Sequence, residues 1–172
     1  MPVDSFKWLP PSLAAWMRQE WKVPDERSTT PFTPLAKPVS LMRFALLTTG
    51  GLYLKGQQPP FDMEREERDP DWGDPTYRVI PRDTPSERIG VAHKHYNPED
   101  IERDCDVLLP IHRFAELEAS GEIGSLATSN YSVMGYQGHP GPRWTTWREE
   151  TGPAVLRRMR EEGVEGVLLT PA

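Results

Sequence analysis

Apolar side chains along the chain gather in short runs that polar, proline-rich or glycine-rich stretches separate. Continuous apolar runs at 44–47 and 164–169 predict strands that are buried on both faces of a sheet. Shorter or alternating runs at 77–81, 88–96 and 123–138 predict further strands, the last of them running through polar residues into a glycine loop. The two continuous runs are expected to lie parallel to each other in the sheet interior.

Helical patterns lie between these runs. Asn97 is a predicted N-cap for a brief helix, and an apolar stripe from 110 onward predicts a second helix that stops at Gly121. The last helix is expected from an N-cap at Thr151 to Gly163, directly before the final strand. Strands that alternate with helices predict an α/β fold, a three-layer sandwich with a mostly parallel sheet.

Prolines set the N-terminal region apart from the rest of the chain. We expect a Pro-rich N-terminal arm over residues 1–39 and one α/β domain over 40–172, with a charged, exposed loop at 61–75. A short amphipathic helix is predicted at 12–21. The apolar content of the arm indicates that it packs across its own domain or on a partner subunit. Between residues 10 and 38 its prolines are Pro10, Pro11, Pro24, Pro31, Pro34 and Pro38.

Charge and cysteine content exclude some classes of protein. The 26 Asp+Glu against 20 Lys+Arg give a formal net charge of −6 without a basic patch, so no nucleic-acid partner is expected. No apolar run reaches the ~20 residues of a membrane span, and the N-terminus lacks the order of a signal peptide.

The single cysteine, Cys105, cannot form an internal disulfide, which favours a cytoplasmic location. Asp104 and Asp106 flank it and should raise its pKa, so we expect a poor nucleophile.

Polar residues at the predicted strand ends are the candidates for a site. The Thr48–Gly51 turn is either an anion cradle made of backbone N–H groups or a plain tight turn. His93 and His95 are two residues apart, which fits a metal site, a general acid–base or substrate-binding role, or a structural role.

Two more segments carry polar side chains at predicted strand ends. Arg78 and Asp83 lie in "YRVIPRDTP", where they either hold a turn or bind an anionic substrate group. Asn130, Tyr131 and Ser132 precede a glycine loop, the position where α/β proteins place ligands.

The ordered series of motifs resembles a known family. The stretches are "FALLTTGGLYLKGQQPPF", "DPTYRVIPRDTP", "VAHKHY", "LLPIHRFAELEASGEIGSL", "NYSVMG" and "TGPAVLRRMREEGVEGVLLTPA". In this order they resemble the selenoprotein B family, the B subunits of glycine, sarcosine and betaine reductases and of D-proline reductase. The resemblance covers roughly residues 40 to 172.

The resemblance implies a reaction. Family members cleave a C–N bond of a small amino-acid-like substrate reductively: a selenocysteine or cysteine nucleophile attacks the α-carbon while a partner's pyruvoyl group activates the amine. In the family the nucleophile follows a strand equivalent to "VEGVLLT", and this sequence reaches Ala172 without it. No cofactor is therefore expected in this chain itself. Another protein subunit, or a further copy of the chain, is the expected partner.

The matching positions are expected to form the site. His93 is the candidate catalytic residue, and no metal ligands are assigned. These positions are expected to converge near Pro171, where the last strand ends. The candidate substrate-binding residues are Thr48, Thr49, Gly50, Gly51, Arg78, Asp83, His95, Tyr131 and Ser132.

Three hypotheses remain open at this point. The chain is a subunit or fragment of a selenoprotein B reductase, a non-catalytic binding or assembly paralogue of that scaffold, or a small metal-dependent enzyme that uses His93 and His95. Under the first hypothesis an in-frame UGA codon for selenocysteine follows Ala172, whereas a true short paralogue has an ordinary stop codon there.

Overall fold

The computed structural model describes residues 9–12, 14–15, 33–69, 72–93, 97–136 and 142–171. The chain divides into two compact units, 1–34 and 35–172. In the first unit, positions 11–12 and 14–15 are helical, and the Ala14 N–H donates to the Pro10 carbonyl at 2.9 Å. Most of the expected Pro-rich arm, including Trp8 and Phe32, lies outside the described residues.

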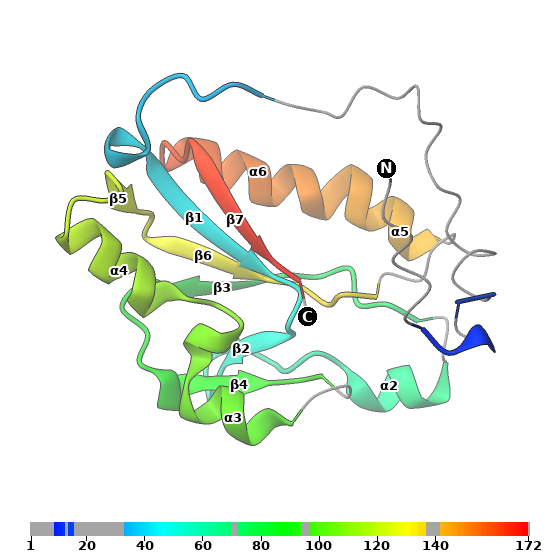
Figure 1. Ribbon diagram of the computed structural model, residues 1–172. Helices are drawn as coiled ribbons and strands as arrows, with labels where there is room; N and C mark the ends of the chain where they lie inside the picture. The colour runs from blue at the N-terminus through cyan, green and yellow to red at the C-terminus, as the bar shows by residue number, and fades with distance from the viewer. Residues whose placement is uncertain are drawn as a thin grey trace. The chain divides into compact units, whose positions relative to one another are not determined.

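The second unit is built on a mixed sheet that is mostly parallel (Figure 1). Its central strand is β1, which pairs in parallel with β5 and β6 along one edge and with β7 along the other, while β3 joins β6 antiparallel. These strands are β1 (Arg43–Thr48), β3 (Arg78–Pro81), β5 (Ser125–Leu126), β6 (Ser129–Ser132) and β7 (Gly166–Thr170). The sequence-based prediction of a mostly parallel α/β sheet is confirmed.

The last strand lies at the edge of this sheet. In the described part of the chain, β7 pairs with β1 alone, in the register Phe44↔Gly166 to Thr48↔Thr170. Val167 and Leu169 are 42% and 65% exposed. The expectation that β7 is parallel to β1 is confirmed, but the expectation that it is interior is wrong. A continuous apolar run has the same appearance in an interior strand and in an edge strand whose neighbour comes from elsewhere.

A second, two-stranded sheet flanks the first. β2 (Leu52–Leu54) pairs antiparallel with β4 (Ile89–Val91), so the predicted third strand does not join the main sheet. β2 was not predicted from the sequence, because only three residues separate it from β1. Gly51, which has a φ of +64°, makes this sharp change of direction possible.

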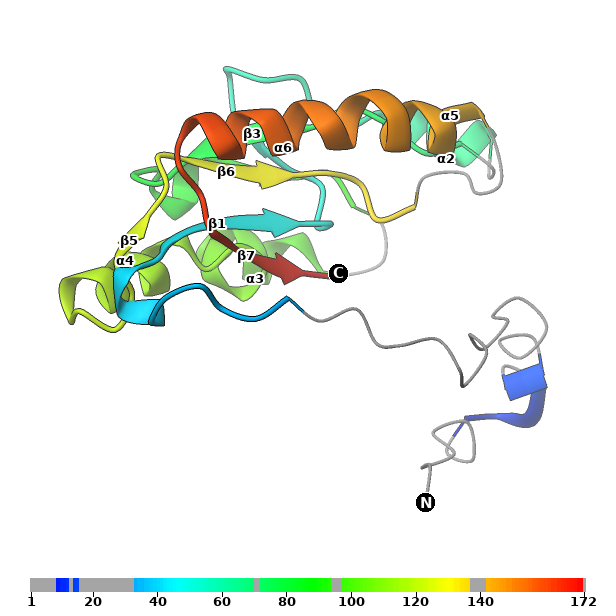
Figure 2. The same cartoon turned by 90° about the horizontal axis from the view of Figure 1, so that it is seen from above.

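Helices cover both faces of the main sheet and complete the three layers (Figure 2). The last helical segment crosses one face, and α3, α4 and the small sheet cover the other. The α-helices are α2 (Met63–Arg68), α3 (Pro98–Arg103), α4 (Ile111–Ala119), α5 (Pro142–Thr146) and α6 (Gly152–Glu161). The short helical turns are η2 (Val39–Leu41), η3 (Ser86–Arg88), η4 (Cys105–Val107) and the π-helical turn η5 (Trp147–Thr151). None of the helices in the described ranges is long and apolar enough to cross a membrane.

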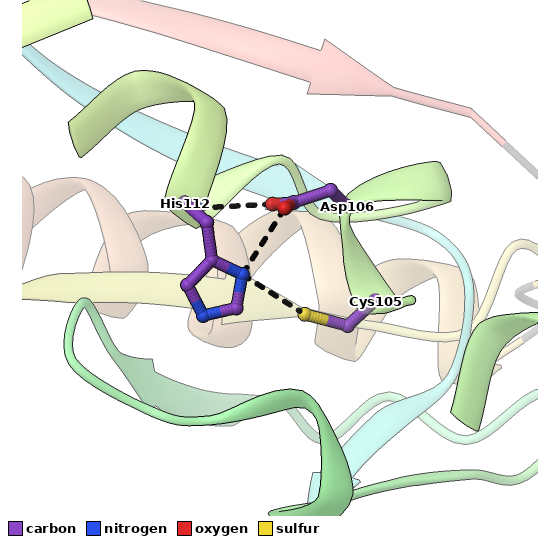
Figure 3. A group of neighbouring side chains, drawn as sticks. All are labelled: Cys105, Asp106 and His112. Carbon is purple, nitrogen blue, oxygen red and sulfur yellow. Dashed lines mark hydrogen bonds and ion pairs between the residues drawn. The ribbon is translucent and has the colours of Figure 1, made fainter. Parts of the chain in front are cut away.

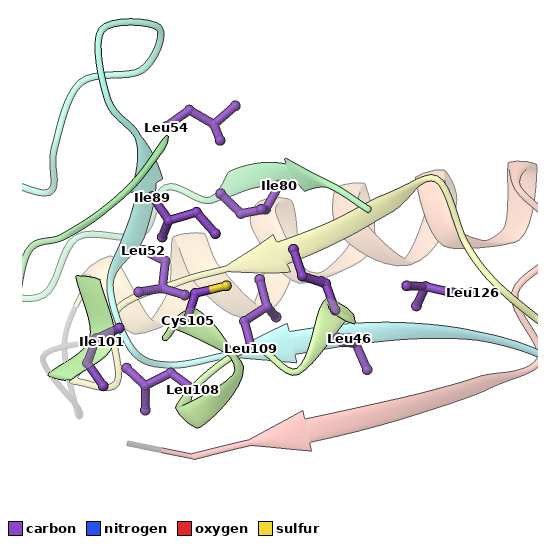
Figure 4. Close-up of a cluster of buried hydrophobic side chains, with 11 residues drawn as sticks. Leu46, Leu52, Leu54, Ile80, Ile89, Ile101, Cys105, Leu108, Leu109 and Leu126 are labelled. Atoms are coloured by element: carbon purple, nitrogen blue, oxygen red, sulfur yellow. The ribbon is translucent and has the colours of Figure 1, made fainter. Parts of the chain in front are cut away.

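The alternation of side chains along β1 creates two cores. Ala45 faces α6 and packs with Tyr131, Val155 and Met159. Leu46 faces the opposite side, where it joins the larger cluster shown in Figure 4. The other members of that cluster are Leu52, Leu54, Ile80, Ile89, Ile101, Cys105, Leu108, Leu109, Ile111 and Leu126.

Two local predictions were wrong. The segment 61–75 is not simply an exposed loop, because it contains α2 and buries Phe61 and Trp72 in a third apolar cluster. Thr151 is not a side-chain N-cap: α5, η5 and α6 follow one another without a break, and the Thr151 hydroxyl donates to the Pro75 carbonyl at 2.6 Å. The predicted helix stops at Gly121 and Gly163 are confirmed by their φ angles of +76° and +70°.

Candidate functional site

Three chain segments meet where the parallel strands end, and we call this place the carboxyl rim. The Thr48 hydroxyl and the Thr49 N–H both donate to the Thr170 carbonyl, at 3.1 and 3.2 Å. The Val133 N–H donates to the Thr48 carbonyl at 2.9 Å. The Thr48–Gly51 turn therefore lies between the end of β7 and the segment after β6, as the sequence predicted for the surroundings of Pro171.

The backbone donors of this turn are engaged within the protein. The Thr49 N–H bonds to Thr170, the Gly50 N–H donates to the Thr48 hydroxyl at 3.1 Å, and the Gly51 N–H donates to the Val133 carbonyl at 3.2 Å. An anion cradle would need these same N–H groups. The geometry is therefore that of a tight turn that ties the rim together.

Tyr131 and Ser132 leave β6 on opposite faces. The Ser132 hydroxyl accepts from the Leu52 N–H at 2.7 Å and so joins β6 to β2. The Tyr131 side chain is buried against α6, where desolvation raises the pKa of its phenol while the nearby Arg158 guanidinium opposes the rise. The Arg158 guanidinium lies close to its hydroxyl, but the two do not form a hydrogen bond of full geometry. Tyr131 thus supports the α6 layer, and its phenol does not face the same side as Ser132.

His93 follows the small sheet and lies beside the turn. The Ala92 N–H donates to the Gly51 carbonyl at 2.9 Å. A Cβ at Gly51 would lie 3.8 Å from the His93 Cβ. The structure therefore brings His93 next to the carboxyl rim, half-buried. His95 lies outside the described residues.

Arg78 and Asp83 lie at opposite ends of β3. Arg78 pairs in register with Ser132, near the rim, but its guanidinium donates to the Pro59 carbonyl at 2.9 Å and stacks 4.2 Å above the Phe61 ring. Burial is the main reason why its pKa is lowered. Asp83 follows Pro81, which pairs with Ser129 at the other end of the sheet, and its side chain is 93% exposed. The two residues therefore do not share a site.

A mostly apolar hollow of about 460 Å³ opens at the carboxyl rim. The Trp144 and Trp147 rings stack in its wall, with centroids 6.2 Å apart and planes at 4°. The indole N–H of Trp147 is buried and has no hydrogen-bond partner among the described groups. The lining residues are Leu47, Thr49, Val133, Met134, Gly135, Trp144, Trp147, Leu169, Thr170 and Pro171.

Neither tryptophan was among the site residues predicted from the sequence. Their spacing of three residues in "PRWTTWREE" was a usable signal, because it places two aromatic side chains on neighbouring turns of one helix. A second hollow, of about 210 Å³, continues from the first along β7 and α6 and shares Leu47, Val133, Trp147 and Leu169 with it.

A polar cluster lies on the other side of the sheet (Figure 3). The His112 Nδ1 is 3.1 Å from a carboxylate oxygen of Asp106 and 3.9 Å from the Cys105 sulfur. Burial is the main reason why the pKa of the Cys105 thiol rises to about 11, and the Asp106 and Asp104 carboxylates add to the rise. The predicted rise of the thiol pKa is thus confirmed, although desolvation outweighs the flanking charges. The part played by His112 was not foreseen.

The sequence comparisons agree with one another. Residues 15–172 match the profile of a family described as glycine/sarcosine/betaine reductase selenoprotein B. D-proline reductase subunit gamma from Acetoanaerobium sticklandii is 34% identical over 139 residues, which are 81% of this chain and 52% of that protein. The glycine reductase complex component B subunit gamma from Carboxydothermus hydrogenoformans is 27% identical over 140 residues, 81% of this chain and 30% of that protein. No solved structure shows a significant match.

The matched proteins are longer than this chain. The aligned region spans about half the length of the D-proline reductase subunit and a smaller share of the glycine reductase subunit.

Proposed function

Because the chain belongs to the glycine/sarcosine/betaine reductase selenoprotein B family, we propose that it is a subunit or part of a reductase B component. In this role it forms the scaffold and one wall of a composite site for reductive C–N bond cleavage. The substrate class is a small amino-acid-like compound such as glycine, sarcosine, betaine or D-proline.

The carboxyl rim is the observation that carries the proposal. The turn after β1, the segment after β6 and the end of β7 are joined there by hydrogen bonds and enclose the apolar hollow of about 460 Å³. In α/β proteins, ligands bind beyond the carboxyl ends of parallel strands. His93, beside the turn, is the candidate for proton transfer at this place.

The reactive nucleophile must come from another segment of polypeptide. A selenolate or thiolate has to be ionised and exposed to attack a substrate carbon. Cys105 is the only cysteine of the sequence, and it is fully buried with a raised pKa, so it does not fit the role. The selenocysteine or cysteine, and the pyruvoyl group that activates the amine, are therefore proposed to belong to polypeptide other than residues 1–172.

A second candidate function is a non-catalytic assembly role in the same kind of complex. The engaged N–H groups of the Thr48–Gly51 turn favour it, because the backbone N–H groups of Thr49, Gly50 and Gly51 are not available to a substrate carboxylate. In this case the hollow receives a side chain of a partner protein in place of a substrate.

The test isolates the complex from the source cells through an affinity tag on this chain. We expect it to cleave the C–N bond of at least one of the four compounds in the presence of a dithiol reductant. Cleavage releases a free amine from glycine, sarcosine or betaine, and it opens the ring of D-proline to a chain with a primary amine. Complex that contains the chain but cleaves none of them would establish the assembly role instead.

Substitutions in α5 then test the hollow. Trp144→Ala is expected to raise KM by more than about tenfold while the variant still enters the complex, because the hollow loses one of its aromatic walls. Thr145→Ala, the exposed neighbour, is the matched control and should leave KM unchanged. An unchanged KM in Trp144→Ala would show that the substrate does not bind in this hollow.

A further inference from the structure

We propose that Cys105, Asp106 and His112 form a binding site for a divalent zinc-class cation, which we call the η4–α4 site. It lies on the face of the sheet opposite α6, between η4, the start of α4 and the loop before β4 (Figure 3). The proposal does not depend on the proposed reductase role.

The ligand atoms are already close to metal-binding geometry. One sulfur, one nitrogen and one carboxylate oxygen lie within 4.8 Å of one another. The Nδ1–Sγ distance is 3.9 Å and the Nδ1–Oδ2 distance is 3.1 Å. Around a tetrahedral zinc ion with ordinary bond lengths, neighbouring ligand atoms are about 3.3 to 3.6 Å apart. The two distances from Nδ1 need shifts of only a few tenths of an ångström, and the sulfur and the carboxylate oxygen, which lie within 4.8 Å of each other, need to approach by at most about 1 Å.

The second ring nitrogen of His112 fixes its orientation. Nε2 is 3.1 Å from the Thr84 carbonyl oxygen, which can only accept, so Nε2 carries a proton. Histidines that ligate metals commonly donate their other ring N–H to a backbone carbonyl in this way. The remaining nitrogen, Nδ1, faces the Asp106 carboxylate and the Cys105 sulfur. A lone pair on Nδ1 and the Asp106 carboxylate repel each other, and a cation bound between them would remove that repulsion.

The Asp106 carboxylate is also held in place. Its Oδ1 accepts from the His112 backbone N–H at 2.9 Å, which leaves Oδ2 directed at the ring. The Arg113 Nε approaches the same Oδ2 at 3.4 Å, but the Arg113 side chain is 61% exposed and its Nη1 pairs with Glu116 at 2.9 Å. Arg113 is therefore a competitor that can turn toward solvent.

Charge balance favours a divalent ion. The cation displaces the thiol proton to solvent and forms the metal–sulfur bond, so one thiolate and one carboxylate neutralise its two positive charges. A partly buried site with no net charge avoids the cost of an uncompensated ion. Mixed sulfur, nitrogen and oxygen ligands suit zinc better than calcium or magnesium, which prefer oxygen alone. The Ser86 hydroxyl, 3.4 Å from the sulfur, or a water molecule completes the fourth position.

Cobalt(II) is the probe that tests the site, with the full chain stripped of metal at mildly alkaline pH. We expect one Co²⁺ per chain, with the near-ultraviolet charge-transfer band of a cobalt–thiolate bond and the visible bands of tetrahedral cobalt. Because Cys105 is the only cysteine, the charge-transfer band reports on this site alone. Zinc should displace the cobalt and abolish the bands.

Variants identify the ligands. Cys105→Ser should abolish the charge-transfer band, and His112→Gln and Asp106→Asn should each weaken cobalt binding by more than about tenfold. His93→Gln is the matched histidine control and should bind as the wild type does. Circular dichroism establishes that each variant is folded.

Two results would overturn the proposal. One is wild-type protein that binds no cobalt through sulfur, a measurement that needs no variant. The other is a folded His112→Gln protein with unchanged cobalt affinity. If His93→Gln lost the metal while His112→Gln kept it, the cation would belong at the carboxyl rim instead.

Discussion

At the scale of single residues, a buried polar side chain of β6, Asn130, supplies a hydrogen-bond acceptor that the backbone of the sheet lacks. β1 pairs with β5 at Phe44 and with β6 only from Leu47 onward, so the Leu46 N–H has no backbone acceptor across the sheet. The Asn130 Oδ1 accepts from it at 3.0 Å, and Asn130 is fully buried. Asn130 is thus a structural acceptor, although its type and position also suit a ligand-binding residue.

Asn130→Ala should lower the free energy of unfolding by about 1–3 kcal/mol, because it leaves the buried Leu46 N–H without an acceptor. Urea unfolding followed by tryptophan fluorescence measures the change. Thr128→Ala, an exposed position two residues away, is the control and should stay within about 0.5 kcal/mol of the wild type. Equal stabilities of the two variants would contradict the role given to the Asn130 amide.

The sequence was informative about Cys105 and less so about Ser132 and Asn130. Flanking carboxylates are visible in the sequence, and they predicted the direction of the thiol pKa correctly. Which backbone N–H lacks a partner depends on the register between strands far apart in the chain. Polar residues at a strand end therefore suggest a ligand-binding site, even where their side chains form hydrogen bonds with the backbone instead.

At the scale of elements, the turn between β1 and β2 sets the shape of the carboxyl rim. Gly51 has a φ of +64°, and a Cβ there would lie 2.4 Å from the Ala92 carbonyl oxygen. Gly56, in the next turn, has a φ of +74° but no atom within 4 Å of an added Cβ. Comparing substitutions at the two glycines therefore separates the cost of backbone strain from the cost of steric crowding.

Gly51→Ala should lower the free energy of unfolding by more than about 3 kcal/mol, since left-handed strain adds to a clash with backbone. Gly56→Ala, the matched control, should cost only about 1–2 kcal/mol from strain. Chemical denaturation of both variants measures the difference. If they were equally stable, the close approach of Gly51 and Ala92 would not hold in solution.

Apolar runs predicted which segments are strands but not all of their neighbours. The runs at 44–47 and 164–169 became β1 and β7, in parallel register. Such a pattern could not predict the edge position of β7. An apolar run indicates that a segment is covered by other polypeptide, but it does not indicate which segment covers it. The prediction for the segment 61–75 was wrong for a related reason. Its many charged residues indicated an exposed loop, although its two large apolar side chains, Phe61 and Trp72, pack in the core.

At the scale of the whole molecule, the open edge of β7 and the apolar hollows form one surface. Val167, Leu168 and Leu169 are each more than a third exposed, and β7 pairs with β1 alone in the described part of the chain. Val167 and Leu169 also line the hollow under α6. A strand edge of this kind pairs readily with further polypeptide. The relatives are subunits by name and contain additional residues beyond the matched region, so a covering segment is available in proteins of this family.

We expect the chain to associate with another copy or with partner polypeptide at micromolar concentration, through the edge of β7. Leu169→Lys should weaken this association by more than about tenfold, because contact would bury an unpaired ammonium group in an apolar hollow. Its effect on the free energy of unfolding should stay within about 0.5 kcal/mol, because Leu169 is 65% exposed.

Leu41→Lys is the matched control and should associate as the wild type does. Leu41 is 63% exposed in η2 and is not part of this hollow. Sedimentation velocity over a range of concentrations measures all three proteins. A wild-type chain that stays monomeric alone and with the isolated complex components would contradict association through any surface of the chain. Equal weakening by both lysines would mean that the edge of β7 is not the interface, and association through the Pro-rich N-terminal arm would then be the one to test.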